Sequence, residues 1–406
     1  MTVTTANFPA EREAKLPIAA LLALAMSGFI CIVTETLPAG LLPQIGNGLE
    51  VSQALAGQTV TAYAVGSLLA AIPLTIATSS WRRRNVLLLT LAGFLVFNMV
   101  TAVSNNYWLT LTSRFFAGVA AGLAWSLLAG YARRMVSPDQ QGKAMAIAMV
   151  GAPIALSLGV PIGTWLGAAV GWRATFWIMS ALTVALVFWV IAKVPDYPGI
   201  KKGGRIPLTK VLKTPGVLSV LAVVIMWMLA HNILYTYIAP FVAPAGLSNR
   251  VDLVLLVFGI TALAGIGVTG KLVDRALRKT VLASLLVFAM IALAFALLPA
   301  SPTLVFTGVA IWGLTFGGAA TLLQTALADT AGDGADVALS MNVVAWNSAV
   351  AGGGIVGGIL LNTYGVSSFS WAVVLLLIVG LILAWRARSR GFPAGHRSSS
   401  AQIVGH

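Results

Sequence analysis

"KVPDYPGIKKGGRIPLTKVLKTPG", Lys193 to Gly216, is the longest polar interruption in an otherwise apolar chain of 406 residues. Six apolar segments precede this stretch and six follow it. A helix needs about 20 apolar residues to cross a bilayer, and the segments are about that long or longer. The stretch therefore predicts a linker that joins two halves of similar size.

The twelve apolar segments are the candidate membrane spans. Several exceed 20 residues and contain Gly or Pro, which indicates tilted or kinked helices. Their approximate bounds are 17–45, 52–78, 86–104, 107–131, 143–169, 172–193, 216–243, 252–270, 280–299, 303–328, 337–362 and 367–386.

The composition excludes a water-soluble protein. Hydrophobic residues make up 59% of the chain and charged residues only 9%, whereas soluble domains carry about 25% charged residues. The net charge of +14 could suit nucleic acid, but the basic residues stand in short clusters between the apolar segments. Such clusters orient a membrane protein, so the partners expected are the lipid bilayer and no nucleic acid.

The distribution of Lys and Arg predicts the orientation. If both termini are cytoplasmic, only Arg173 and Arg250 lie outside and only Arg114 lies within a span, out of 25 basic residues. This is the asymmetry of the positive-inside rule. We therefore expect a multi-pass protein of the bacterial cytoplasmic (inner) membrane, with both termini and the linker in the cytoplasm.

The two halves resemble copies of one another. Adding 195 to a residue number takes Gly118 and Gly122 to Gly313 and Gly317, and other span pairs match at the same offset. Parallel six-span repeats indicate one transporter architecture. The expected organisation is a cytoplasmic tail, a six-helix bundle, a linker, a second six-helix bundle and a disordered cytoplasmic tail, with bounds 1–16, 17–193, 194–215, 216–386 and 387–406.

The loop after the eighth span reads "GKLVDRALRK", from Gly270 to Lys279. It resembles the Gly-x-Leu-x-Asp-Arg-x-x-Arg-Lys loop motif of the major facilitator superfamily. Gly270 lets the backbone turn, and Asp274 can pair with Arg275, with Arg278 or with a helix N-terminus. The first-half copy, "TIATSSWRRRN", has Ser79 where Asp274 would stand. That copy keeps the basic cluster but lacks its acid.

Three further regions resemble the drug/proton antiporters of this superfamily, and within them the sugar-efflux and purine-efflux-like branch. They are "SRFFAGVAAG" at 113–122, "GAPIALSLGVPIGTWLGAAVGWRATF" at 151–176, and the pair "HNILYTYIAPF" and "AWNSAVAGGGIVGG". "TETLPAGLLPQI" is similar to the first span of that branch. The resemblance implies an all-α major facilitator fold of twelve transmembrane helices in two bundles. It also implies that Gly159, Pro161 and Gly163 form a helix contact at which the two halves move.

Glu35 stands inside the first apolar segment with no basic residue near it in sequence. A carboxylate within a bilayer is expensive to insert, and such residues are usually functional. Burial favours its neutral form and a nearby cation its charged form, so it could take up and release protons. The alternative is that the long first span brings Glu35 to the outer headgroups.

Arg114 is the only basic residue within a span, and helix lengths place it in the same half of the membrane as Glu35. In the superfamily that the chain resembles, the first and fourth spans adjoin and line the central cavity. We therefore expect a proton-sensitive pair of Glu35 and Arg114; the alternative is a static structural pair.

His231 is the only histidine within a span, and the offset of 195 brings it next to the position of Glu35 in the other half. A histidine there could carry protons or donate a hydrogen bond in a cavity. It could equally pack between helices. Further polar and aromatic candidates for a substrate cavity are Asn232, Tyr235, Tyr237, Gln324, Asn342, Trp346 and Asn347. Such residues also serve as contacts between helices.

Enzyme function finds no support in the sequence. No phosphate-binding loop and no metal-ligand spacing is present, so neither cofactor nor metal is expected. We expect proton-coupled efflux of a small molecule (a sugar, nucleoside or drug-like compound) by alternating access in a monomer. A proton symporter or facilitator of the same fold is the first alternative. A non-transporting membrane sensor is the second, although a sensor would need a sizeable soluble domain.

Overall fold

The computed structural model describes residues 16–199, 207–298, 300–393 and 395. The predicted tail 1–16 therefore lies almost wholly outside the described residues, as do the centre of the linker and most of the predicted tail 387–406. Residues 387–393 are described, and Phe392 is fully buried. The packed part of the second half thus extends beyond the predicted limit at 386.

The first half of the chain is helical throughout. Its apolar runs form long helices because a helix satisfies every backbone polar group within the segment itself, as a bilayer demands. The elements are α1 (Ile18–Gly40), α2 (Leu42–Leu49), α3 (Gln53–Ala77), α4 (Arg83–Val103), α5 (Tyr107–Arg134), η1 (Pro138–Gln140), α6 (Gln141–Met149), α7 (Gly151–Ile154), η2 (Ala155–Gly159), α8 (Val160–Val170) and α9 (Trp172–Lys193).

The second half follows the same pattern. Ser301 caps its helix α14 by accepting a hydrogen bond from the Leu304 amide, as Ser52 and Asn106 cap α3 and α5 in the first half. The elements are α10 (Leu208–Leu212), α11 (Val217–Thr236), α12 (Ile238–Val242), η3 (Ala243–Ala245), α13 (Val251–Leu297), α14 (Pro302–Gly317), α15 (Ala319–Ala331), η4 (Gly332–Gly334), α16 (Ala335–Tyr364) and α17 (Ser368–Arg386).

Eleven helical segments within the described ranges are long and apolar enough to cross a membrane. The longest, α13, has 47 residues, or about 70 Å at 1.5 Å per residue, more than twice the apolar thickness of a bilayer. Its backbone leaves helical geometry at Ala276, with φ −149° and ψ 35°. The predicted eighth and ninth spans are therefore joined in α13 and separated at Ala276.

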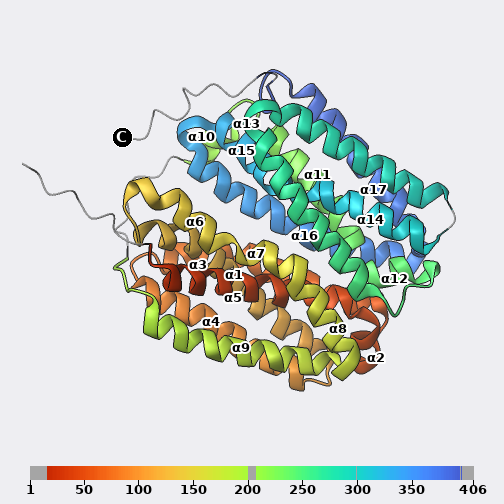
Figure 1. Cartoon of the computed structure of the whole chain (residues 1–406), viewed down its shortest axis with the longest axis horizontal. Coiled ribbons are helices and arrows are strands. Elements are labelled where there is room, and N and C mark those ends of the chain that lie inside the picture. Colours follow the sequence, from red (N-terminus) through yellow and green to blue (C-terminus); the bar gives the residue numbers. More distant parts are fainter. Residues whose placement is uncertain (1–15, 200–206, 299, 394, 396–406) are drawn as a thin grey trace, which may run out of the picture.

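The helices gather into two bundles. Figure 1 shows α1–α9 in the lower part of the molecule and α10–α17 in the upper part. The bundles meet where α3 packs on α16, where α8 and η2 pack on α13, and where α1 packs on α11. We call the end that holds α10 the linker end and the end that holds α2 and α12 the distal end.

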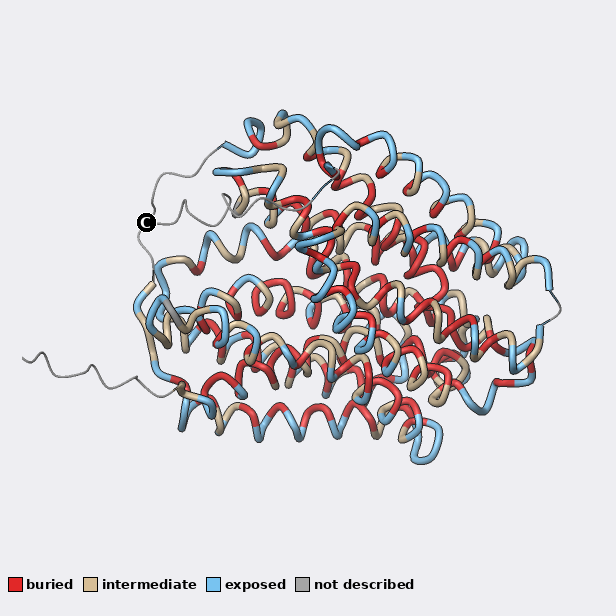
Figure 2. The backbone as a smooth tube through the Cα atoms, turned by 45° about the horizontal axis from the view of Figure 1, so that its top comes forward, coloured by how far each residue is buried: buried red, intermediate tan, exposed pale blue. Residues whose placement is uncertain are grey.

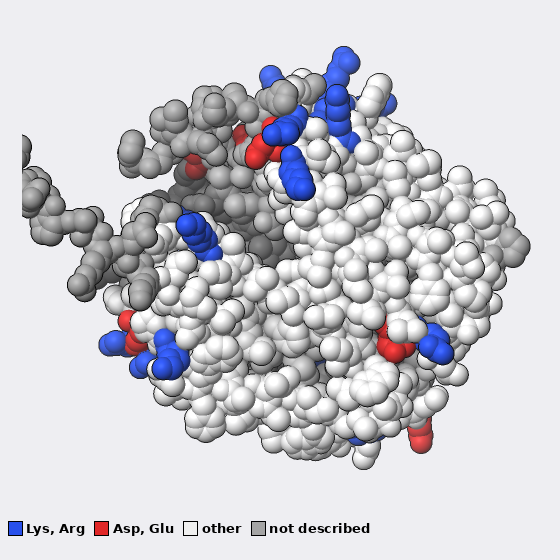
Figure 3. Space-filling model, viewed as in Figure 1, with Lys and Arg blue, Asp and Glu red and all other residues white. Residues whose placement is uncertain are grey.

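The outer faces of both bundles are apolar. Large side chains are exposed there, such as Trp108 (70%), Phe188 (68%) and Leu375 (64%). Figure 2 shows exposed and buried residues alternating along the peripheral helices. In Figure 3 the charged side chains keep to the margins of the visible face and leave its middle uncharged. So large an apolar surface requires a lipid environment.

Candidate functional site

Glu35 lies in the distal third of α1, about 25 Å from the start of that helix at 1.5 Å per residue. Its side chain is partly buried among residues that are mostly fully buried. Within the described part of the chain the carboxylate makes no ion pair and no hydrogen bond. It interacts electrostatically with Arg114 of its own bundle and with Tyr235 of the other bundle.

Arg114 is fully buried, about 10 Å from the distal end of α5. Its Nε donates to the Thr59 carbonyl oxygen at 3.3 Å, and its Nη2 donates to the Glu35 backbone carbonyl oxygen at 3.3 Å. The guanidinium carbon lies 4.9 Å from the ring centre of Tyr63 and 5.6 Å from that of Phe176. Backbone oxygens and aromatic rings therefore hold this cation in place.

The structure brings Glu35 and Arg114 together, but the contact is not the ion pair that the sequence suggested. Arg114 donates to the backbone of Glu35, and its Nη1 is buried without a hydrogen-bond partner in the described residues. An unpaired buried N–H of a charged group is costly. One arm of the guanidinium is thus available for a group that enters the site, while the carboxylate stays unpaired beside it.

His231 lies in a cluster of aromatic rings in the second bundle, which we call the ring cluster: His231, Tyr235, Phe258, Trp312 and Phe316. The imidazole is stacked on Phe316, with ring centres 3.6 Å apart, and on Tyr235, with ring centres 5.1 Å apart. Phe258 and Trp312 complete the cluster at 5.6 and 5.2 Å from the imidazole. His231 therefore packs between helices α11, α13 and α14.

The ring cluster also holds buried polar atoms without partners. His231 Nδ1, the Tyr235 hydroxyl and Trp312 Nε1 have no hydrogen-bond partner in the described residues. All three side chains are at least nine-tenths buried. Buried polar atoms are normally paired with protein or with ordered water. Three unpaired atoms among five rings suit a planar molecule that is apolar on its faces and polar at its edge.

The remaining predicted cavity residues are scattered. Asn232 and Asn347 donate to carbonyl oxygens one turn back in their own helices, at 2.8 and 2.9 Å. Asn342 is buried with its Oδ1 unpaired, whereas Gln324 is exposed. Trp346 is partly buried. Of the predicted cavity residues, Tyr235 stacks on His231 and also interacts electrostatically with Glu35.

Tyr237 takes part in a contact between the bundles. Its hydroxyl donates to the Gly354 carbonyl oxygen at 2.7 Å, and the Gln58 amide of α3 donates to the Tyr237 hydroxyl and to the same carbonyl oxygen, each at 3.1 Å. Gly57 and Gly358 leave room for these side chains. Gln58 was not among the residues predicted from the sequence; an amide within the apolar run "QALAGQTVTAYAVG" was the available signal.

The glycines at 159 and 163 differ from expectation. A side chain at either position would meet α1 of the same bundle: Phe29 and Val33 at Gly159, and Leu37 at Gly163. The close contact of this segment with the other bundle is at Ser157, two residues before Gly159, where Gly259 of α13 packs on the Ser157 backbone in the π-helical element η2. Pro161 is buried at the start of α8.

The loop motif of the second half lies at the linker end. Arg278 donates to the carbonyl oxygens of Ala384 and Trp385, at the end of α17, and of Phe392. A cation at a helix C-terminus stabilises it. A side chain at Gly270 would meet nothing within 4 Å. Asp274, Arg275 and Lys279 are exposed.

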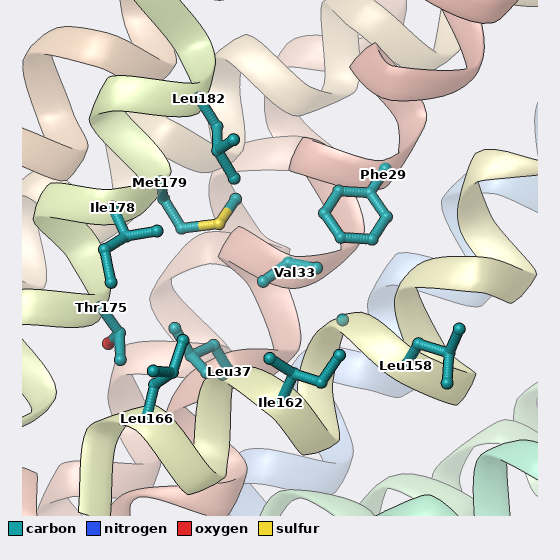
Figure 4. A pocket seen from close by; sticks show the side chains of 12 residues that line it. Phe29, Val33, Leu37, Leu158, Ile162, Leu166, Thr175, Ile178, Met179 and Leu182 are labelled. Atoms are coloured by element: carbon teal, nitrogen blue, oxygen red, sulfur yellow. The ribbon is translucent and has the colours of Figure 1, made fainter. Parts of the chain in front are cut away.

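An apolar cavity of about 190 Å³ lies between α1, α8 and α9. Figure 4 shows Phe29, Val33, Ile162, Met179 and Leu182 turned toward this space. None of the predicted substrate residues lines it, and its lining offers almost no polar atoms. No cluster of metal-ligating side chains occurs among the described residues. Glu35, Arg114 and the ring cluster lie outside this cavity.

Comparison with known proteins gives consistent matches. The sequence model of the Major Facilitator Superfamily matches residues 24–339. The purine ribonucleoside efflux pump of Shigella sonnei is 30% identical over 363 residues, which cover 88% of this chain and 91% of the relative. The pump of the same name from Escherichia coli K12 is 29% identical over the same shares.

A solved structure has the same fold. The crystal structure of the human organic anion transporter MFSD10 matches with a TM-score of 0.65 over 91% of this chain and 99% of that one. Its sequence is 17% identical.

Proposed function

We propose that this chain, which belongs to the Major Facilitator Superfamily, exports a small molecule across a bacterial cytoplasmic membrane in exchange for protons. It is a membrane transporter and not an enzyme, and its curated relatives are efflux pumps. The observation that carries the proposal is the Glu35 carboxylate, unpaired in the described residues and next to the fully buried Arg114.

Two opposing effects make Glu35 suitable for proton coupling. Burial stabilises the neutral carboxyl group, and the guanidinium of Arg114 stabilises the ionised carboxylate. When Glu35 is neutral, Arg114 is a buried cation with an unpaired Nη1. When Glu35 is ionised, the two charges cancel. Each protonation state therefore favours a different arrangement of α1 and α5, the helices that carry Glu35 and Arg114.

We propose a purine ribonucleoside as the substrate class. The support is the name of the relatives, together with the unpaired polar atoms of the ring cluster. Aromatic rings stack on a nucleobase, and the edge of a base donates and accepts hydrogen bonds. Tyr235 connects the ring cluster to Glu35, because it stacks with His231 and interacts electrostatically with Glu35.

We assign the linker end to the cytoplasm on the distribution of Lys and Arg. The hydrogen bonds of Gln58 and Tyr237 then join the bundles on the outer side. A transporter in this state would take up its substrate from the cytoplasm. A symporter of the same geometry would move protons in the same direction as the substrate, and a facilitator would move the substrate without protons.

The test is transport of radiolabelled inosine into proteoliposomes in which the cytoplasmic side of the protein faces the medium. The imposed pH gradient makes the interior more acidic than the medium. Wild-type protein should concentrate inosine, with a proton flux that depends on inosine. Glu35→Gln should lose this accumulation and keep downhill exchange, because the cavity shape barely changes. Glu50→Gln alters an exposed acid and serves as the control.

Three results would count against the proposal. Accumulation by Glu35→Gln equal to wild type would exclude Glu35 as the coupling group. A proton flux in the same direction as inosine would show symport. Failure of the wild type to bind or move inosine would exclude this substrate class and leave the coupling to be measured with another compound.

A further inference from the structure

The two halves differ in where they carry an acid: one position is in the loop after the second span, and the other is just after the last helix. Position 79 and position 274 correspond at the offset of 195, and they hold Ser79 and Asp274. Position 196 and position 391 also correspond, and they hold Asp196 and Gly391. The first half therefore lacks the loop acid and has an acid just after its last helix, whereas the second half has the reverse.

In the first half, residues 194–199 fold back onto the loop between α3 and α4. We call this segment, Val194 to Gly199, the clip. Asp196 forms an ion pair with Arg82, and its Oδ1 accepts a hydrogen bond from the Arg84 amide at 3.2 Å. The Tyr197 carbonyl oxygen accepts from the Arg83 amide at 2.8 Å. These two amides belong to the first turn of α4, where helix amides have no partner within the helix.

The clip also contacts the end of α5. The Tyr131 hydroxyl donates to the Pro195 carbonyl oxygen, and Arg134 donates to the Pro198 carbonyl oxygen, each at 2.8 Å. The rings of Tyr131 and Tyr197 meet edge to face, with centres 5.9 Å apart. A side chain at Gly199 would collide with the backbone of Ser79 and Ser80, so the clip lies directly on the loop that has lost its acid.

The second half shows the matching fold-back. Phe392 corresponds to Tyr197, is fully buried, and accepts a hydrogen bond from Arg278. Arg278 corresponds in turn to Arg83, whose amide donates to Tyr197. In each half the chain thus folds back, after the last helix, onto the junction between the second and third spans. The position of the acid is what differs between the halves.

We propose that Asp196 replaces the missing loop acid of the first half, and that the clip fixes the start of the linker to the first bundle by capping α4. The ion pair alone would contribute little, because Arg82 is exposed and pairs of exposed charges are weakened by solvent. The cap is the larger part, since the carboxylate also satisfies an amide at the positive end of α4.

The experiment is hydrogen exchange by mass spectrometry on the full-length protein in detergent, with transport measured in parallel. Asp196→Ala should speed exchange of the first-turn amides of α4 about fivefold, the effect of losing one cap. Adding Ser79→Asp to that variant should restore most of the protection, because the acid returns to the loop. Arg82→Gln, which breaks the ion pair but keeps the cap, should change exchange less than Asp196→Ala.

Two controls make the result specific. Ser80→Asp in the Asp196→Ala background adds the same charge one residue away and should not restore protection. Asp252→Asn removes an acid from the first turn of α13 and should leave α4 unchanged. Unchanged exchange in Asp196→Ala would overturn the proposal. Equal rescue by acids at 79 and 80 would overturn the equivalence of position 79 with Asp196.

Discussion

The interiors of the two bundles differ at corresponding positions. Glu35 and Arg114 of the first bundle correspond to Ala230 and Val309 of the second, and both of these are fully buried. The repeat therefore supplies the same backbone twice but places an acid and a base in one copy only. A second buried acid and base would add a large desolvation penalty.

For aromatic residues the larger side chains are in the second bundle. Trp312 and Phe316 correspond to Ala117 and Ala121, both fully buried. Rings thus fill the second bundle where small residues let helices approach closely in the first. Under the proposed function, proton exchange falls to the first bundle and recognition of a planar substrate to the second.

The largest effect should come from removing the buried cation. Arg114→Met should lower pH-driven transport by about 100-fold or more, because it removes two hydrogen bonds from a charged donor, each worth about 1.5–3 kcal/mol, together with the cation proposed to act on Glu35. Val309→Ala at the corresponding position should lower it severalfold at most. Initial rates in proteoliposomes, normalised to folded protein, give the comparison. Equal losses would mean that the charge has no special role.

The contact between the bundles comes next. A side chain at Gly354 would lie 2.0 Å from Thr61 Oγ1 across the interface, and overpacking costs about 1–3 kcal/mol. Gly354→Val should therefore reduce transport roughly tenfold and leave the distal end more accessible to an impermeant thiol reagent at an introduced cysteine. Gly267→Val is the control, because a side chain there meets nothing within 4 Å. Wild-type transport in Gly354→Val would show that the contact does not close tightly.

A smaller effect should separate recognition from coupling. His231→Phe keeps a ring in the ring cluster and removes its titratable nitrogen. We expect the KM for inosine to rise about threefold, in the range of one neutral hydrogen bond, while the dependence on the pH gradient stays as in the wild type. Loss of that dependence would make His231 the coupling group and reverse the division of roles.

The smallest effect should be the pH dependence of the clip. Burial raises the pKa of the Asp196 carboxyl, but hydrogen bonds from Arg82 and from the Arg84 amide outweigh it, and the pKa lies below its ordinary value. A lowered pKa stabilises the folded state above the unfolded value of about 3.9 and loses that contribution as the pH falls through the folded value. The difference in Tm between wild type and Asp196→Asn should thus be constant from pH 7 to 5 and shrink below about pH 4. A difference that grows on acidification would contradict the assignment.

The sequence predicted the architecture because bilayer spans need long apolar runs, and such runs are visible without a structure. It also predicted the division into two halves, the internal repeat and the membership in the superfamily. It also identified Glu35 and Arg114 as unusual, because a charge in an apolar segment stands out at any helix rotation. The roles assigned to these residues, the orientation of the chain and its oligomeric state stay predictions.

Only the tertiary structure decided which atoms meet. The helices are apolar on nearly all sides, so no amphipathic stripe sets their rotation in advance. The sequence therefore could not show that Arg114 donates to the Glu35 backbone or that Gln58 donates to Tyr237. Asp196 lies 112 residues from the amide that it caps, a distance over which local sequence carries no signal. Contacts of this kind depend on how each helix is rotated about its axis and on where the chain folds back after the last helix. Packing of the whole bundle determines both.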